Sequence, residues 1–293
     1  MTRAHAPVGG RRALETEAWR AAEAVASRAG LRLAELSDVD AQNAATALFR
    51  RIWRSEEDPP IGSALVRAIQ FTGGYVAGAY LGGELVGAAV AFFAADGHLH
   101  SHITGVAPGH RGRHVGRALK LHQRAWALAR GVTVIKWTFD PLVRRNAFFN
   151  IARLGALPTA YLVDFYGELT DALNAGAGSD RLVAEWRLDS PRAVAAAAGA
   201  WHEPDVDRLR ETGCVRLDRT ASGEPLPRAD AWRAGRACLV AVPEDVEALR
   251  AVDGDLAWRW RVEVRAALRE GMAQGWRVTG MARAGWYVVE ADK

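Results

Sequence analysis

The sequence predicts an α/β fold, in which a mixed, mostly antiparallel sheet contains one parallel strand pair and a smaller C-terminal α+β unit follows. The clearest signal is a hairpin, because two alternating apolar runs, Tyr75–Leu81 and Glu84–Ala95, are separated only by Gly82-Gly83. The second signal is a segment with apolar residues at helical spacing, which lies between two further apolar runs. It predicts a parallel strand pair, because a helical crossover joins parallel strands.

Helices and one strand are expected before the hairpin. Residues 1–12 are expected to be disordered, whereas Leu14–Arg28 carries a helical stripe of apolar residues. Leu31–Leu36 alternates like a strand, and Asp40–Trp53 again has apolar residues at helical spacing. A further short helix is expected after Pro59-Pro60.

The parallel pair is expected on either side of the next helix. His98–Val106 continues the sheet as a third antiparallel strand, and Val115–Arg130 is a helix that Gly131 ends. Val132–Phe139 then forms the parallel strand, and a helix near Val143–Leu154 follows it.

The rest of the chain is expected to finish this sheet and to form the second unit. The composition changes after Pro191 to Ala-rich helix and loop. We therefore divide the chain into residues 1–30 as a tail and helix, 31–192 as the main domain and 193–293 as a C-terminal subdomain. The other expected elements are strands near Ala160–Tyr166, Arg181–Leu188 and Cys238–Val242, a helix over Leu256–Ala273 and a hairpin of Trp276–Met281 with Trp286–Glu290.

Composition and charge exclude several classes of protein. The chain has 38 basic and 34 acidic residues, which are interleaved along its length, so no basic cluster indicates a nucleic-acid partner. Its longest apolar run, Leu85–Ala95, is far shorter than the ~20 residues of a membrane span, and its two cysteines lack metal or disulfide-framework spacing. We expect a cytoplasmic protein without membrane or nucleic-acid partners, as a monomer or homodimer.

One stretch, Ile103–Leu119, combines a strand end, a turn rich in Gly and Arg and the start of a helix. Free backbone N–H groups at a helix N-terminus, together with the helix dipole, favour a bound phosphate. The stretch therefore predicts an anion site of the kind that holds a cofactor.

Within this stretch, the sequence R-G-R-H-V-G-R-A at Arg111–Ala118, entered from V-A-P, resembles the acyl-CoA-binding signature of the GNAT superfamily of N-acetyltransferases. The resemblance covers roughly Leu31–Leu188. It implies the GNAT fold, in which the strand before the signature splays from its parallel neighbour, and acetyl-CoA or another acyl-CoA as cofactor. It also implies that Thr104 and Val106 pair with the pantetheine arm. The pyrophosphate is implied to lie on Arg111, Gly112, Arg113, His114, Val115, Gly116 and Arg117, through backbone N–H groups from Gly112 onward and with added charge from Arg113 and Arg117.

Two positions depart from the GNAT pattern. The family usually has Gly where this chain has His114, and a side chain is tolerable there if the backbone is right-handed helical. An ungapped fit also puts Ile151 at the family's usual tyrosine, which is the general acid for the departing thiolate. The candidate substitutes for this acid are Asn146, Asn150, Tyr161 and Tyr166.

Three histidines, His98, His100 and His102, lie at alternate positions of one expected strand and therefore share a face. Their segment is distantly similar to arylalkylamine N-acetyltransferases, in which two histidines relay the proton of the amine. This resemblance implies His100 as the base and His102 as the orienting or second relay residue, and an unperturbed pKa of ~6.5 suits imidazole to that step. Two readings stay open beside it: a pair of zinc ligands, or hydrogen-bonded members of the sheet.

We therefore expect an enzyme that moves an acetyl or other short acyl group from acyl-CoA to the amine of a small molecule, without a metal. Two alternatives remain, a non-catalytic acyl-CoA-binding module and an O-acyltransferase or decarboxylase of the same fold. The candidates to bind a cationic acceptor are four acidic residues, Asp140, Asp164, Asp180 and Glu185. We expect Arg259, Arg261 and Arg265 to lie on a solvated helix face.

Overall fold

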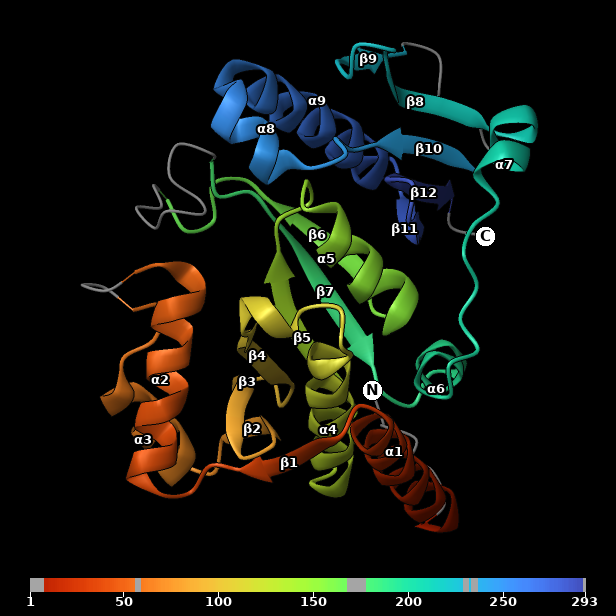
Figure 1. Cartoon of the computed structure of the whole chain (residues 1–293). Helices are drawn as coiled ribbons and strands as arrows, with labels where there is room; N and C mark the ends of the chain where they lie inside the picture. The colour runs from red at the N-terminus through yellow and green to blue at the C-terminus, as the bar shows by residue number, and fades with distance from the viewer. Residues whose placement is uncertain (1–7, 56–58, 168–177, 229–231, 233–236, 292–293) are drawn as a thin grey trace. The chain divides into compact units, whose positions relative to one another are not determined.

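The computed structural model describes residues 8–55, 59–167, 178–228, 232 and 237–291 (Figure 1). The chain forms two compact units. The first contains Met1–Lys136 and Arg187–Ala198, and the second contains Trp137–Trp186 and Gly199–Lys293. These units differ from the ranges 31–192 and 193–293 drawn from composition, which stay a prediction.

The first unit is built on a sheet whose strands follow the order β1-β2-β3-β4-β5. The first four strands are antiparallel neighbours, and β5 pairs parallel with β4. The strands are β1 (Leu31–Glu35), β2 (Tyr75–Leu81), β3 (Glu84–Phe93), β4 (Leu99–Val106) and β5 (Val134–Phe139), of which β5 continues into the second unit. The helices are α1 (Val8–Arg28), α2 (Val39–Trp53), α3 (Ser63–Phe71), α4 (Val115–Ala129) and α6 (Pro191–Ala197).

Helices cover both faces of this sheet (Figure 1). On one face, α2 and α3 bury a cluster that includes Phe49, Val66 and Ile103. On the other face α4 lies close to β3, because a Cβ at Gly87 would come within 2.7 Å of the Val115 Cγ1 atom. A glycine at this position therefore brings the start of α4 directly against the sheet.

The second unit pairs β7 with β6 and adds a separate five-stranded sheet of order β11-β12-β10-β8-β9. Its strands are β6 (Leu157–Leu162), β7 (Arg181–Arg187), β8 (Cys214–Arg219), β9 (Pro225–Pro227), β10 (Cys238–Ala241), β11 (Trp276–Ala282) and β12 (Trp286–Ala291). Its helical elements are α5 (Arg144–Phe148), the π-helical turn η2 (Phe149–Arg153), α7 (Val206–Thr212), α8 (Val246–Val252) and α9 (Gly254–Ala273).

The structure confirms the predicted mixed, mostly antiparallel sheet, which includes the parallel pair β4–β5, and an additional C-terminal unit. The β2–β3 hairpin and the parallel crossover through α4 occur where the sequence placed them. Within the described residues, no helix combines the length and the apolar character needed to cross a membrane.

Several expected bounds of single elements differ from those of the structure. Helix α1 begins at Val8 rather than Leu14, while residues 1–7 of the expected disordered tail lie outside the described residues. The strand expected to begin at His98 starts at Leu99. The helix expected near Val143–Leu154 is divided into α5 and a π-helical turn. Strand β6 ends at Leu162 because the chain turns at Asp164, whose φ is 45°.

Candidate functional site

The turn between β4 and α4 exposes the start of a helix. A short 3-10 turn, η1 (Pro108–His110), leads into Gly112 and His114, whose φ angles are 78° and 63°. The first hydrogen bond of α4 is donated by the Ala118 amide to the His114 carbonyl at 2.9 Å. The amides of residues 115–117 thus precede the helical ladder, and they are the donors that a helix N-terminus offers to an anion.

His114 occupies this turn in the left-handed region, at the N-cap of α4. A right-handed backbone was the condition under which a side chain would be tolerable here, and that condition is not met. The imidazole is accommodated because it lies on the exposed surface of the turn, at a backbone cost of about 1–2 kcal/mol. A glycine would adopt the same conformation without this cost.

Gly116, in the first turn of α4, is partly exposed and has room beside it. A Cβ at this position would meet Val106 Cγ2 at 3.6 Å, which is ordinary van der Waals contact, and its φ is not in the left-handed region. A side chain is therefore sterically tolerable at Gly116, and a charged one there would face the first-turn amides.

The arginines of the turn differ in what their side chains do. Arg111 and Arg113 are exposed, so their guanidinium groups are free to reach an anion at the turn. Arg117 is 9% exposed and donates to the carbonyls of Ala196 and Ala197 in α6, at 3.0 and 3.1 Å. The expected charge contribution of the Arg117 side chain is thus corrected, and only its amide faces the turn.

Strand β4 leaves its parallel neighbour early. In the described pairing, β4 and β5 are in register only at Leu99↔Ile135 and His100↔Lys136, whereas β3 accompanies β4 as far as Val106. The Ala107 amide donates to Val86 of β3 at 2.9 Å, and successive amides of a strand point to opposite edges. The amides of Thr104 and Val106 therefore point to the edge away from β3.

Two histidines of β4 lie on one face of the strand, beside a bulge. The register shifts from Val90↔Ile103 to Ala91↔Ser101, which leaves His102 as the additional residue. The imidazole centroids of His100 and His102 lie 6.2 Å apart, and each is within 6 Å of the Phe92 ring. His98 belongs instead to the turn before the strand, where it is paired with Asp96.

Burial favours the neutral form of both histidines, and neighbouring charge adds to this effect at His100. Burial lowers the pKa of His100 to about 4, with further lowering by His102, His98 and Lys120. Burial likewise lowers the pKa of His102. Both imidazoles are therefore unprotonated near neutral pH, which is the form that accepts a proton.

A family model matches part of the chain. Residues 46–155 match the family model described as Acetyltransferase (GNAT) family. The family-model match thus gives a GNAT acetyltransferase domain over these residues. Among curated proteins, none matches the chain significantly.

Solved structures of low identity resemble about half of this chain. The ribosomal-protein-S18-alanine N-acetyltransferase of Escherichia coli is 15% identical, with a TM-score of 0.46, over 55% of this chain and 95% of its own. An N-acetyltransferase of Staphylococcus aureus Mu50 is 14% identical, with a TM-score of 0.46, over 54% of this chain and 99% of its own. The yncA protein of Salmonella typhimurium, solved with its cofactor acetyl-CoA, is 18% identical, with a TM-score of 0.44, over 55% of this chain and 95% of its own.

The residue at the usual GNAT tyrosine position, Ile151, is fully buried and carries no acidic group. Of the candidate substitutes, Tyr161 donates to Asp180 at 2.6 Å, and burial raises the pKa of its hydroxyl well above the ordinary value. Tyr166 is half exposed and shares a hydrogen bond with Thr138, while Asn146 is exposed and Asn150 is buried. All four belong to the second unit.

Sequence reasoning missed a buried lysine behind the histidine strand of the GNAT domain. Lys120 of α4 donates to Ser101 Oγ at 3.0 Å and to Gln123 Oε1 at 2.7 Å, and burial lowers its pKa to about 7. The sequence signal for its burial was its position between Leu119 and Leu121. A residue between two core leucines of a tightly packed helix is itself near the core. No three His, Cys, Asp or Glu side chains among the described residues are placed to hold a metal ion.

The expected solvated arginine face is corrected at Arg261 and Arg265, whereas Arg259 is exposed as expected. Arg261 of α9 is 1% exposed and forms a two-pronged ion pair with Asp140, at 2.7 and 2.8 Å. Arg265 pairs in the same way with Asp180 at 2.8 Å. The two carboxylates are therefore neutralised within the second unit instead of awaiting a cationic acceptor.

Proposed function

We propose that the protein is an N-acyltransferase that moves an acetyl or other short acyl group from acetyl-CoA, or another acyl-CoA, to the amine of a small molecule. The observation that carries the proposal is the exposed turn of residues 111–114 that leads into α4, which follows a strand that leaves its parallel partner at His100. A cofactor that carries both a phosphate group and a long thioester arm requires an anion site and, next to it, a strand edge with free backbone donors.

The chain offers donors for both parts of such a cofactor. Amides from Gly112 to Arg117 are positioned for a pyrophosphate, and the exposed side chains of Arg111 and Arg113 add positive charge. The amides of Thr104 and Val106, on the edge of β4 away from β3, are positioned for the amide groups of a pantetheine arm. Acetyl-CoA, when bound, supplies the acyl group as a reactive thioester.

The protein's own part in the chemistry is to position the amine and accept its proton. An amine reaches the enzyme as ammonium and becomes a nucleophile only after deprotonation. His100 is neutral near pH 7 because its pKa is lowered to about 4, so it accepts the proton, with His102 as its neighbour on the same face. Its low pKa makes it a weak base, and positioning is thus expected to supply most of the rate enhancement.

The test is thioester consumption by the full chain with a panel of small-molecule amines, followed by mass analysis of the products. Acetyl-CoA binding with formation of an N-acylated amine supports the proposal. Binding without turnover across the panel identifies a non-catalytic acyl-CoA-binding module, a function favoured by the absence of an acid at Ile151. An O-acylated or decarboxylated product identifies the other chemistry left open by the fold.

A further inference from the structure

Two arginines of α9 in the second unit are paired with a carboxylate. Arg261 and Arg265 each form two hydrogen bonds to one carboxylate, Asp140 and Asp180 respectively. These partners raise the pKa of both guanidinium groups above the ordinary value, despite the opposing effect of burial. Paired burial of this kind is what a stable interior requires of a charged group.

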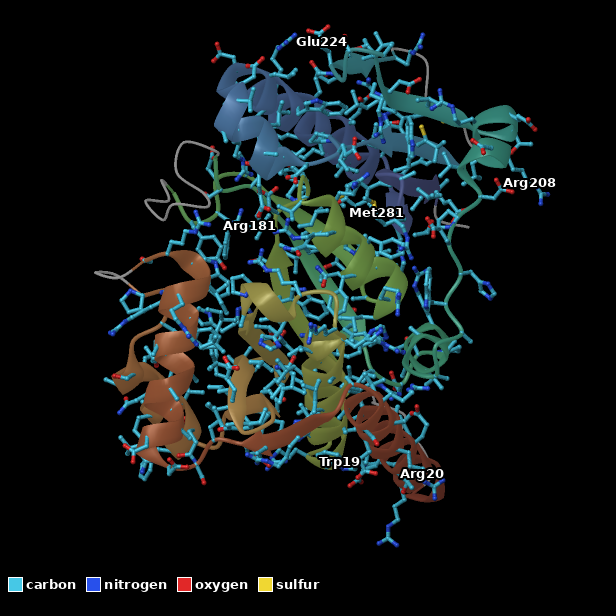
Figure 2. The ribbon with its side chains drawn as sticks, in the orientation of Figure 1. Trp19, Arg20, Arg181, Arg208, Glu224 and Met281 are labelled. Atoms are coloured by element: carbon cyan, nitrogen blue, oxygen red, sulfur yellow. The ribbon has the colours of Figure 1, made fainter. Side chains whose placement is uncertain are left out.

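Arg181, the first residue of β7 and labelled in Figure 2, differs from these two arginines. It is 8% exposed, yet its guanidinium donates to a neutral group, the Asp180 carbonyl, at 2.8 Å. The carboxylate oxygens of Asp180 are engaged by Arg265 and by the hydroxyl of Tyr161. In agreement with this geometry, burial lowers the pKa of Arg181, and the more distant charges do not offset it.

The groups beside Arg181 suit an anionic organic ligand. Its guanidinium carbon lies 5.2 Å from the centroid of the Tyr166 ring, and the Tyr166 hydroxyl is 3.1 Å from Thr138 Oγ1. Thr138 lies near the carboxyl end of β5, the strand end at which open α/β sheets receive ligands. Phe165 and Tyr166, in edge-to-face contact, are 48% and 46% exposed, so their rings are accessible to an apolar group.

We propose that Arg181 and the hydroxyl groups of Thr138 and Tyr166 form a binding site for a small carboxylate, whose apolar part packs on the rings of Phe165 and Tyr166. A guanidinium matches a carboxylate in charge and in hydrogen-bonding geometry, and the hydrogen-bonded hydroxyl groups of Tyr166, whose ring lies beside Arg181, and of Thr138 are further donors to it. All four residues belong to the second unit, and the site does not depend on the acyl transfer proposed above.

The experiment titrates the full chain with phenylacetate and with phenylacetamide, its uncharged counterpart, by isothermal calorimetry at constant ionic strength. We expect saturable binding of phenylacetate and at least roughly tenfold weaker binding of phenylacetamide, because a charge-assisted hydrogen bond is lost. Equal binding of the two probes, or none of phenylacetate, would overturn the proposal.

Variants locate the bound probe. Arg181→Met is expected to lose phenylacetate binding, whereas Arg208→Met, at an exposed arginine of α7 in the same unit, is the matched control and should bind as the wild type does (Figure 2). If Arg181→Met does not fold, the variants Tyr166→Phe and Thr138→Val can be used, because both keep the guanidinium. Each single substitution should weaken phenylacetate binding severalfold. Wild-type affinity in a folded Arg181→Met variant, or in the Tyr166→Phe/Thr138→Val double variant, contradicts the assignment.

Discussion

Replacement of Gly116 by glutamate is expected to separate cofactor binding from folding. Gly116 lies in the first turn of α4, and a Cβ there has van der Waals room beside Val106. A carboxylate in the first turn of a helix is favourable to the helix dipole by about 0.3–1 kcal/mol, and glutamate has a better helix propensity than glycine. We therefore expect Gly116→Glu to leave thermal stability unchanged or slightly raised.

The same carboxylate should oppose the cofactor strongly. A negative charge at ~5 Å from a bound phosphate group costs about 3 kcal/mol at an effective dielectric constant of ~20, and solvent screening at this partly exposed position reduces it to roughly half. Affinity for acetyl-CoA is thus expected to fall by about ten- to hundredfold. The two effects have opposite signs, so a general loss of structure cannot imitate the predicted result.

Two control variants isolate the charge. Gly116→Gln has nearly the shape of glutamate without its charge, and Gly116→Ala tests the space alone. Calorimetric titration with acetyl-CoA should give the order alanine, glutamine, glutamate from tightest to weakest, with glutamate clearly separated from glutamine. Equal affinities of the glutamate and glutamine variants would refute the placement of the pyrophosphate on the first turn of α4.

Three further predictions concern the histidines and the buried lysine. His100→Ala should lower kcat severalfold or more at pH 7 with little change in acetyl-CoA affinity, and the wild-type rate should fall only as the pH drops toward the pKa of His100, about 4; a pH–rate profile unchanged by the substitution would contradict this. His114→Gly should raise stability by about 0.5–1 kcal/mol relative to His114→Ala, because glycine relieves the left-handed backbone; a lower melting temperature for glycine would refute it. The pKa of Lys120 falls from its ordinary value to about 7 on folding, so wild-type stability should increase as the pH rises from about 7 to 10.5, whereas Lys120→Met should lack this increase in pH-dependent chemical denaturation.

Features fixed by local chemistry were predictable from the sequence. The Gly82-Gly83 turn between two alternating runs specified the β2–β3 hairpin, and both glycines adopt positive φ as such turns require. The Gly/Arg turn before Val115 likewise indicated an exposed helix start. In each case the residues that determine the structure are adjacent in the chain.

Features fixed by distant contacts were not predictable in the same way. Arg261 was expected in solvent because its own helix gives no sign of Asp140, which is 121 residues away and neutralises it in the interior. The early start of α1 also reflects a tertiary contact, since the helix packs along α4 and its local apolar signal begins only at Leu14. The left-handed backbone of His114 contradicts the ordinary preference of histidine, and only the turn that surrounds it selects this conformation.

The most direct test of the account is the backbone amide spectrum of the isotope-labelled full chain during titration with acetyl-CoA. We predict that the largest ¹H–¹⁵N shifts occur at Gly112 to Arg117 and at Thr104 and Val106, while the amides of α9 do not move. Absence of any shift, or shifts that leave the start of α4 unaffected, would contradict the claim that main-chain donors of this turn hold the cofactor.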